Sequence, residues 1–489
     1  MSFLLCLACA ATAWQDGPRA EAPAAPAAMD VVVAFEEALT GAIARTEGSV
    51  VAIHRDKSEN AGETLAVRGK PRPRRVIGDE GRPSRPADDV AISFDFGAGV
   101  VIGDDGEILT AFHVVRGATR LIVRAAGRQE FDAEVIAADP RSDLAVIVPV
   151  AGPGLEPPDL KPMPIGDSST LRKGSFLIAL GNPFNSAMQD GRAAATWGIL
   201  SNVARRVVYD PEVWPVLGND PRARQLPHQP MLLQLDSKLN LGMSGGAVVN
   251  LKGELVGLTT TAASPAGYDA MAGYAFPMDP AGRRAVETLK QGKEVEYGLI
   301  GITQTDSRGE LDARPPNRID GVAPNSPAAQ GELQVGDLFL AVDGTPARDF
   351  SELLVAVSSH APGDKIRLKV LREGRELERT LTIAKYPVKG EVIATARPAA
   401  WRGLRVDHRS LLSVGVVPFG PAAPEPQGVA VREVEPGSPA DKAGLRPWMT
   451  IQEAAGRAVD VPADFAKAVA DQKGPVRLMT DRGPITVGP

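Results

Sequence analysis

The sequence predicts a mainly β protein with a long N-terminal β region and two smaller α+β modules at its C-terminal end. Short apolar runs follow one another from about residue 49 to residue 260, separated by turn sequences such as Asp104-Asp105-Gly106. Closely spaced short strands are typical of an all-β barrel or sandwich. An internal repeat follows, because the segment Ala323–Ala329 resembles Glu435–Asp441. Each copy leads into a short strand and a helix, so the repeat predicts two tandem modules of about 90 residues.

The composition fits a globular protein of roughly three domains. The chain has 489 residues, of which 44% are hydrophobic and 23% charged, and the net charge of −6 gives no indication of nucleic-acid binding. The two cysteines, Cys6 and Cys9, both lie near the start, so the body of the protein is expected to contain no disulfide. With only five histidines, a multi-histidine metal site is hard to build, and neither a metal nor a cofactor is implied.

Residues 1–13 are expected to be a signal peptide, which favours a periplasmic or secreted protein. The apolar run from Ser2 to Ala10 is too short to span a bilayer, and Ala11-Thr12-Ala13 resembles a cleavage site. The basic region that usually opens a signal peptide is missing, so a disordered start, a misassigned start and a lipidated cysteine remain alternatives. Residues 14–29 predict an Ala- and Pro-rich tether. No later segment predicts a transmembrane helix.

The remaining elements follow from apolar periodicity. Val32, Phe35, Leu39 and Ile43 predict an amphipathic helix over Asp30–Thr46, which packs on the protein's own core or meets a neighbouring subunit. A second helix is predicted over Gly282–Gln291, and long polar loops over residues 57–89 and 205–229. The predicted strands are Ser49–His54, Ser93–Phe96, Gly99–Ile102, Glu107–Leu109, Leu121–Arg124, Phe131–Ala137, Leu144–Pro149, Phe176–Leu180, Thr196–Asn202, Met231–Asp236, Ala247–Val249 and Leu255–Leu258.

A serine between small residues, Ser244 in the segment Leu241–Ala247, is the candidate nucleophile. The segment also fits a plain glycine-rich hairpin, and its G-x-S-x-G letters fit the nucleophile elbow of α/β-hydrolases. A serine needs a base for its proton and donors for the oxyanion. His113 ends an apolar strand, and Asp143 begins another. A carboxylate with apolar neighbours needs a partner, and a histidine N–H is a suitable one.

The order of these residues along the chain separates the two enzymatic alternatives. His113, Asp143 and Ser244 follow the chymotrypsin order, whereas an α/β-hydrolase runs serine, acid, histidine. The histidines after Ser244, His360 and His408, both lie inside the repeated modules. The nucleophile-elbow interpretation is therefore not favoured.

Collinear motifs across about residues 48–290 resemble the HtrA/Deg family of trypsin-like serine proteases that carry PDZ domains. The matching segments are Thr110–Val115, Ser142–Val146, Leu180–Phe184, Gln234–Asp236 and Gly242–Gly246. The resemblance implies a chymotrypsin-like double β-barrel protease domain over residues 30–292. It implies a first PDZ-like domain over 297–387, a linker over 388–400 and a second PDZ-like domain over 401–489.

The resemblance also implies roles for residues. Ser244 would be the nucleophile, His113 the base and Asp143 the residue that orients His113. The backbone N–H groups of Gly242 and Ser244 would form the oxyanion hole. Met243 replaces the short polar residue usual before the serine, which would alter packing at the oxyanion turn.

The substrate pocket is implied at Leu239 and Ala262. Both are apolar, so small or medium aliphatic side chains should fit before the scissile bond. Lys238 stands where trypsin carries its specificity aspartate, so cleavage after lysine or arginine is not expected. We expect the Lys238 side chain to point to solvent.

The PDZ-like modules imply capture of C-terminal peptides, because PDZ domains hold a carboxylate in a nest of backbone N–H groups. In the first module, Leu299, Ile300, Gly301 and Ile302 resemble the carboxylate-binding loop. In the second, Trp401–Val406 could be that loop, but Trp448-Met449 replaces the expected Gly-Asp, which leaves its ligand binding open.

The function implied is a serine endopeptidase that hydrolyses unfolded or misfolded proteins in protein quality control. Family members usually form trimers or multiples of trimers, so a homo-oligomer is expected. The alternative is a non-proteolytic chaperone or peptide-binding scaffold that uses the PDZ-like domains. The complete set of His113, Asp143 and Ser244 favours the protease.

Overall fold

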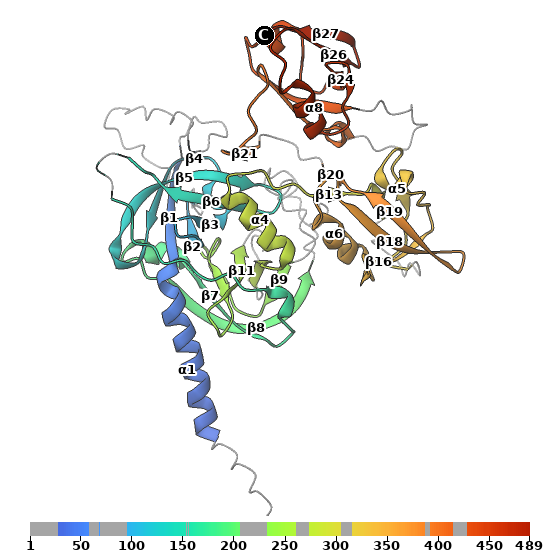
Figure 1. The fold of residues 1–489 in the computed structure, drawn as a ribbon. Helices are drawn as coiled ribbons and strands as arrows, with labels where there is room; N and C mark the ends of the chain where they lie inside the picture. The colour runs from blue at the N-terminus through green and yellow to red at the C-terminus, as the bar shows by residue number, and fades with distance from the viewer. Residues whose placement is uncertain are drawn as a thin grey trace, which may run out of the picture.

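The computed structural model describes residues 28–57, 68, 95–152, 154, 156–205, 232–260, 273–304, 315–386, 392–413 and 428–489. The predicted signal peptide, most of the predicted tether and most of both long polar loops lie outside these residues. Two β-barrels come first, and the two α+β modules follow (Figure 1). Among the described residues, no helix is long and apolar enough to cross a membrane.

The first barrel has six strands, and their order is β5-β4-β1-β2-β3-β6, closed by pairing of β6 with β5. The split predicted between Ser93–Phe96 and Gly99–Ile102 is wrong over the described residues, because Phe96–Val101 is one strand, β2. Glycine allows close packing within this strand, because a Cβ at Gly97 would lie 2.6 Å from Val114. The strands are β1 (Val50–Lys57), β2 (Phe96–Val101), β3 (Ile108–Ala111), β4 (Ala118–Arg124), β5 (Glu130–Asp139) and β6 (Leu144–Pro149).

The second barrel is also closed and six-stranded, in the order β10-β11-β12-β9-β8-β7. The mainly β, double-barrel class expected from the sequence is thus confirmed. The predicted hairpin after Ser244 is present, and its turn closes with a bond from the Gly253 N–H to the Asn250 carbonyl at 2.9 Å. The strands are β7 (Phe176–Gly181), β8 (Ala194–Arg205), β9 (Leu232–Leu235), β10 (Ala247–Val249), β11 (Leu255–Thr260) and β12 (Gly273–Pro277).

Helices α1 (Ala28–Thr46) and α4 (Pro280–Lys290) frame the barrels. Leu39 and Ala42 of α1 are buried in the core that joins the barrels, as are Val286 and Leu289 of α4. The N-terminal half of α1 extends away from the barrels (Figure 1). Shorter helical segments are η1 (Glu47–Ser49), α2 (Phe112–Val115), η2 (Ala126–Arg128), η3 (Ser168–Thr170) and η4 (Pro183–Met188).

The first module surrounds its own core, in which Phe339, Ile366 and Val370 are fully buried. Its entry strand β13 pairs with its exit strand β20, so the chain enters and leaves at one place. Its elements are β13 (Gly298–Leu299), β14 (Ile302–Thr303), β15 (Gly321–Val322), α5 (Pro327–Gln330), β16 (Leu338–Val342), β17 (Thr345–Pro346), α6 (Phe350–Ser358), β18 (Lys365–Arg372), β19 (Arg375–Thr382) and β20 (Ala384–Lys385).

The second module forms one sheet in the order β22-β23-β24-β26-β27, with β25 paired to β24. Between the modules, within the predicted linker, strand β21 (Ile393–Ala394) pairs with β5 of the first barrel. The elements of the second module are β22 (Leu404–His408), η6 (Arg409–Ser413), β23 (Val429–Val434), α7 (Pro439–Lys442), β24 (Thr450–Ala454), β25 (Arg457–Ala458), α8 (Pro462–Val469), β26 (Val476–Thr480) and β27 (Gly483–Val487).

Candidate active site

His113 lies in the short helix α2, directly after strand β3, and is held by Asp143 at two points. The ring Nδ1 lies 2.7 Å from Asp143 Oδ2, and the backbone N–H of His113 donates to Asp143 Oδ1 at 2.9 Å. The carbonyl of His113 accepts from Arg55 Nη1 at 2.7 Å. The structure thus brings this predicted pair together, and one carboxylate fixes both the ring and the backbone of His113. Nε2 is the ring nitrogen that Asp143 does not contact.

Asp143 lies at the tip of the hairpin between β5 and β6 and is only 8% exposed. Its backbone has a φ of +57°, a left-handed conformation that aspartate adopts more readily than most residues. The carbonyl of Asp143 accepts from the Phe112 N–H at 2.8 Å, and its Oδ2 accepts from Thr260 Oγ1 at 3.2 Å. Thr260 was not identified from the sequence, because only the barrel-to-barrel packing brings β11 to this hairpin.

Ser244 lies where the second barrel meets strands β2 and β3 of the first. Its carbonyl accepts from the Ala98 N–H at 2.8 Å. The next residue, Gly245, has a φ of +80°, and a Cβ there would lie 2.2 Å from the Ala98 carbonyl oxygen and 3.0 Å from the Ala111 nitrogen. Glycine is therefore required beside Ser244, and the serine is held against the strands that lead directly to His113.

The turn before Ser244 presents the Gly242 peptide in one defined direction. The Met243 N–H bonds to the Asn240 carbonyl at 3.0 Å, and Gly242 has a φ of +93°, as the third residue of a type II turn requires. The Leu241 carbonyl accepts from the Phe184 N–H at 2.8 Å. Because a trans peptide is planar with N–H and C=O on opposite sides, the Gly242 N–H points away from Phe184.

Two residues support this turn. Asn182 is fully buried; its Nδ2 donates to the Gly97 carbonyl at 3.0 Å, and its Oδ1 accepts from the Ala187 N–H at 2.9 Å. A Cβ at Gly242 would lie 2.2 Å from the Asn182 carbonyl oxygen. Asn182 and Phe184 belong to the segment Leu180–Phe184, which resembles the family, but the sequence predicted no role for either residue.

Met243 packs into the second barrel and is 3% exposed. It lies against Gly181, where a Cβ would come 2.9 Å from its sulfur atom. Its carbonyl accepts from the Gly246 N–H at 3.0 Å and from the Thr259 hydroxyl. The long side chain therefore occupies space left by a glycine and does not face the reacting groups.

The predicted substrate pocket is only partly described. Leu239 is half-buried and covers Gly273 at the start of β12, where a Cβ would lie 2.7 Å from its Cγ. Ala262 lies outside the described residues. Lys238 is exposed, as expected.

The predicted carboxylate loop of the first module runs from β13 to β14. Gly301 has a φ of +79°, and its carbonyl accepts from the Ala323 N–H at 2.8 Å. Ile300 is buried, and its carbonyl accepts from the Ala328 N–H at 2.8 Å. Leu299 pairs with Ala384 of the exit strand, and Ile302 pairs with Val322.

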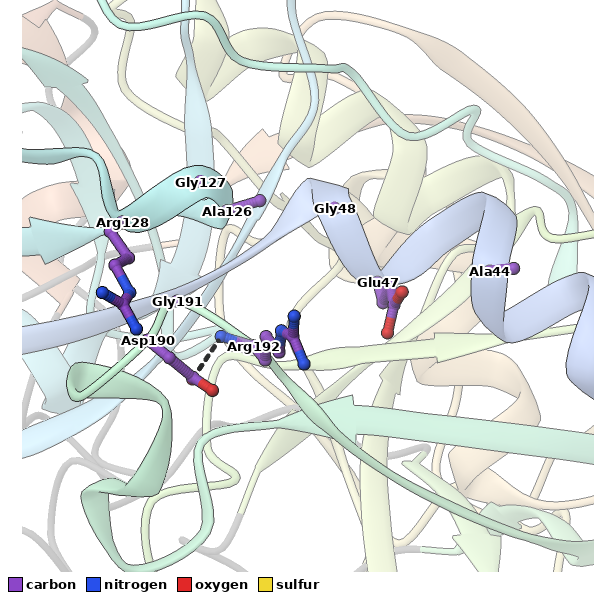
Figure 2. A pocket seen from close by; sticks show the side chains of 9 residues that line it. All are labelled: Ala44, Glu47, Gly48, Ala126, Gly127, Arg128, Asp190, Gly191 and Arg192. Atoms are coloured by element: carbon purple, nitrogen blue, oxygen red, sulfur yellow. Dashed lines mark hydrogen bonds between the residues drawn. The ribbon is translucent and has the colours of Figure 1, made fainter.

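A cavity of about 560 Å³ lies elsewhere on the barrels and contains none of the predicted site residues (Figure 2). It is lined by the end of α1, the adjoining η1, the turn between β4 and β5, and the segment from Asp190 to Arg192. The Arg192 N–H donates to Asp190 Oδ1 at 3.0 Å on its wall. Across the described ranges, no cluster of metal-ligating side chains is present.

Comparisons with known proteins agree with this architecture. Residues 97–258 match the family described as trypsin-like peptidase domain, and residues 298–383 match the PDZ domain family. The chain is 32% identical over 387 residues to a "Probable periplasmic serine endoprotease DegP-like" of Ectopseudomonas mendocina. This alignment covers 77% of the present chain and 74% of the relative. The chain is also 28% identical over 445 residues to the periplasmic pH-dependent serine endoprotease DegQ of Escherichia coli. This second alignment covers 89% of the present chain and 87% of DegQ. Among solved structures, the HtrA-type protease AlgW with tripeptide gives a TM-score of 0.50 at 25% identity, covering 72% of this chain and 98% of that chain.

Proposed function

Because the chain belongs to the HtrA/Deg family of trypsin-like serine proteases with PDZ domains and is a serine endopeptidase, we propose that Ser244, His113 and Asp143 are its catalytic triad. Ser244 Oγ attacks the scissile carbonyl, and His113 takes its proton and passes it to the leaving amine. Asp143 keeps the imidazole oriented and stabilises its charged form. The observation that carries this proposal is that Asp143 contacts both the ring Nδ1 of His113, at 2.7 Å, and its backbone N–H, at 2.9 Å.

The oxyanion hole in this proposal consists of the backbone N–H groups of Gly242 and Ser244. Each such donor contributes on the order of 3 kcal/mol to transition-state stabilisation. The type II turn supports the role of Gly242, because a type I turn would reverse its N–H. The bond from the Phe184 N–H to the Leu241 carbonyl, at 2.8 Å, favours the type II turn.

Casein hydrolysis by the purified full chain tests the triad. We expect Ser244→Ala to lower kcat/KM by roughly a thousandfold or more. Ser168→Ala is the matched control, since Ser168 is also buried but lies in η3, which contains none of the proposed site residues. Each protein is measured with and without a peptide that has a hydrophobic C-terminus. If wild type hydrolyses casein no faster than Ser244→Ala in both conditions, the triad is wrong and the chaperone alternative returns.

We further propose that the substrates are unfolded or misfolded proteins cleaved after small or medium aliphatic residues. Leu239 and Ala262, the two pocket residues that the family resemblance implies, are both apolar, which supports this preference. Mass spectrometry of the products from reduced, unfolded casein reads the preference directly. Cleavage mainly after lysine or arginine would contradict it.

The loop Leu299–Ile302 is proposed to bind C-terminal peptides through its backbone N–H groups. The left-handed Gly301 turn supports this role. Fluorescence anisotropy should therefore show binding of an apolar peptide with a free C-terminus, and at least tenfold weaker binding of the same peptide with an amidated C-terminus. Equal binding of both peptides would contradict carboxylate capture.

A homo-oligomer, as a trimer or a multiple of trimers, is proposed from apolar surface on α1 and β7–β8. Phe35, Phe176 and Trp197 form one cluster with ring centroids 4.7 to 6.1 Å apart, and Trp197 remains 52% exposed. Val31 and Val32 on the same helix are 55% and 60% exposed, and a second copy of the chain would cover such a surface. Light scattering should give three times the mass of one processed chain, or a multiple of that mass, for wild type and a smaller mass for Trp197→Ala. A monomeric wild type would refute the proposal.

We propose that the protein is located in the periplasm, because the similar proteins of Escherichia coli and Ectopseudomonas mendocina are both named as periplasmic. Osmotic-shock release of a protein that lacks residues 1–13 would support it. Recovery of the full-length chain in the cytoplasmic fraction would contradict it.

A further inference from the structure

The hairpin that carries Asp143 touches the first PDZ module as well as His113. Tyr297, the residue before strand β13, is 5% exposed, and its hydroxyl donates to Asp139 Oδ2. Asp139 is the last residue of β5, where the hairpin begins. Burial raises the pKa of the Tyr297 hydroxyl, and the neighbouring Asp139 carboxylate raises it further, so Tyr297 keeps its proton and acts as a donor.

Asp139 in turn shapes the hairpin tip. Its carboxylate accepts from the Arg141 N–H at 3.1 Å, the Ser142 N–H at 3.2 Å and the Ser142 hydroxyl at 2.6 Å. The tip holds Asp143 in its left-handed conformation, a strained backbone state that persists only where surrounding contacts enforce it. The Asp139 cap, completed by Tyr297, is therefore one source of the geometry that directs Asp143 at His113.

Arg141, at the centre of the tip, is held by aromatic rings. Its guanidinium carbon lies 3.9 Å from the centroid of the Tyr297 ring and 4.0 Å from that of Tyr386. Its Nη1 is buried and has no hydrogen-bond partner among the described residues. Burial lowers the pKa of this guanidinium from its ordinary value, although it stays protonated. A desolvated cation over two tyrosine rings is a strong and direction-sensitive contact.

Both tyrosines flank the strand pair at the base of the first module, and both pack in the core that joins the barrels. Tyr297 precedes the entry strand β13, Tyr386 follows the exit strand β20, and the Tyr386 N–H donates to the Tyr297 carbonyl at 2.7 Å. In Figure 1, this strand pair lies at the side of the module that faces the barrels. The backbones of the two tyrosines are thus fixed to each other beside the strand pair.

We infer that Tyr297 and Arg141 are positioning residues of the protease, which hold the hairpin tip that directs Asp143 at His113. The inference rests on the proposed role of Asp143. Neither residue belongs to the proposed substrate pocket, so loss of either contact should lower kcat and leave KM unchanged.

Tyr297→Phe in the full chain tests the inference, because it keeps the ring over Arg141 and removes the hydroxyl from Asp139. We expect kcat on a short chromogenic peptide to fall by about fivefold to tenfold at constant KM. Arg141→Lys keeps the charge but loses the planar stack, and we expect a smaller loss of kcat. Thr288→Val is the matched control: it removes one half-buried hydroxyl, bonded to the Arg284 carbonyl at 2.8 Å, from the helix that leads to Tyr297.

The outcomes separate the inference from the triad. Wild-type kcat in Tyr297→Phe, together with an inactive Ser244→Ala, would overturn the inference and leave the triad standing. An active Ser244→Ala would overturn the triad itself. A raised KM at unchanged kcat would also overturn the inference, because it would place Tyr297 in substrate binding. If Tyr297→Phe fails to fold, Arg141→Lys decides by the same split between kcat and KM.

Discussion

The two PDZ modules build the same loop with different side chains. A Cβ at Gly301 would lie 2.3 Å from Ser326, and a Cβ at Gly403 would lie 2.2 Å from Ser438. Each serine accepts a helix N–H at 3.2 Å, from Ala329 in one module and from Asp441 in the other. Both loop glycines have a φ near +80°. The modules therefore share the backbone arrangement that a carboxylate loop needs.

They differ in the turn that follows each short helix. In the first module, Asp337 is 1% exposed, accepts two bonds of 2.7 Å from Arg372 and one of 2.9 Å from the Gln334 N–H. In the second module, the apolar Met449 fills this place and is also 1% exposed. The preceding residue changes from Gly336 to Trp448, which keeps a positive φ of +74° and is 59% exposed.

They also differ in the loop itself. Ile300 is buried in the first module, whereas Arg402 of the second donates to the carbonyls of Gln472, Gly474, Val487 and Gly488 at 2.7 to 2.9 Å. Trp401 packs edge-on against Phe465 of α8, with ring centroids 5.7 Å apart. The second loop is thus tied to the end of its own chain. In the turn that lacks the ion pair, the Arg446 N–H contacts the Met449 sulfur at 3.2 Å, where the Gln334 N–H bonds to Asp337 in the first module. The comparison teaches that the fold survives the loss of a buried ion pair when another contact holds the same turn.

Breaking the ion pair should give the largest effect. Asp337→Ala leaves Arg372 without its two main bonds, and we expect the first module to lose about 3 kcal/mol of opening free energy. Hydrogen exchange of the full chain measures each module separately, so the second module is the internal control. Equal losses in both modules would show that they do not open independently.

Arg402→Met should act only on the second module. The thioether chain keeps most of the apolar stem but loses four bonds to carbonyl groups, and we expect a loss of about 2 kcal/mol. Exchange protection should fall in β22 and β27 and stay constant in β13–β20. Unchanged protection of β27 would mean that Arg402 does not hold the end of the chain.

The shared serines should matter equally. Ser326→Ala and Ser438→Ala each remove a helix cap, with an expected cost of about 1 kcal/mol in the module that carries the change. The same exchange measurement compares the two. A cost confined to one module would contradict the common frame.

The smallest expected effect is the response to acid. Burial by itself would raise the pKa of Asp337, but the bonds from Arg372 and the Gln334 N–H, with the nearby charge of Arg379, hold it below its ordinary value. A depressed pKa stabilises the folded state above the ordinary value of about 4, and this contribution is lost as the pH falls through the folded-state pKa. Exchange corrected for intrinsic rates at about pH 5 and pH 3 should show a loss in the first module that Asp337→Asn removes. A decline that persists unchanged in Asp337→Asn would assign the response to other groups.

Local sequence signals predicted the elements, while contacts between distant segments escaped prediction. Apolar periodicity predicted α1, a helix was also predicted at α4, and glycines around Ser244 predicted a tight turn. The continuous strand Phe96–Val101 was predicted as two strands, and no local pattern reveals that Gly97 within it packs against Val114. The Tyr297 contact with Asp139 spans 158 residues along the chain and depends on how a module is placed against a barrel. The triad residues were identified by their order and motifs, and their roles stay a prediction until Ser244→Ala is measured.

The strand β21 sets a limit on where this chain can be cut. Ile393 and Ala394 complete the hydrogen bonding of Ala137 and Ala138 in β5, and the Thr395 N–H bonds to the Ile136 carbonyl at 3.0 Å. A shortened protein that ends before Ile393 would expose an edge strand, and an unpaired edge is a site of aggregation. A protein that ends after Ala396 would keep that edge covered. Removal of the second module alone therefore leaves β5 covered, whereas removal of residues 393–396 as well also exposes β5 of the protease.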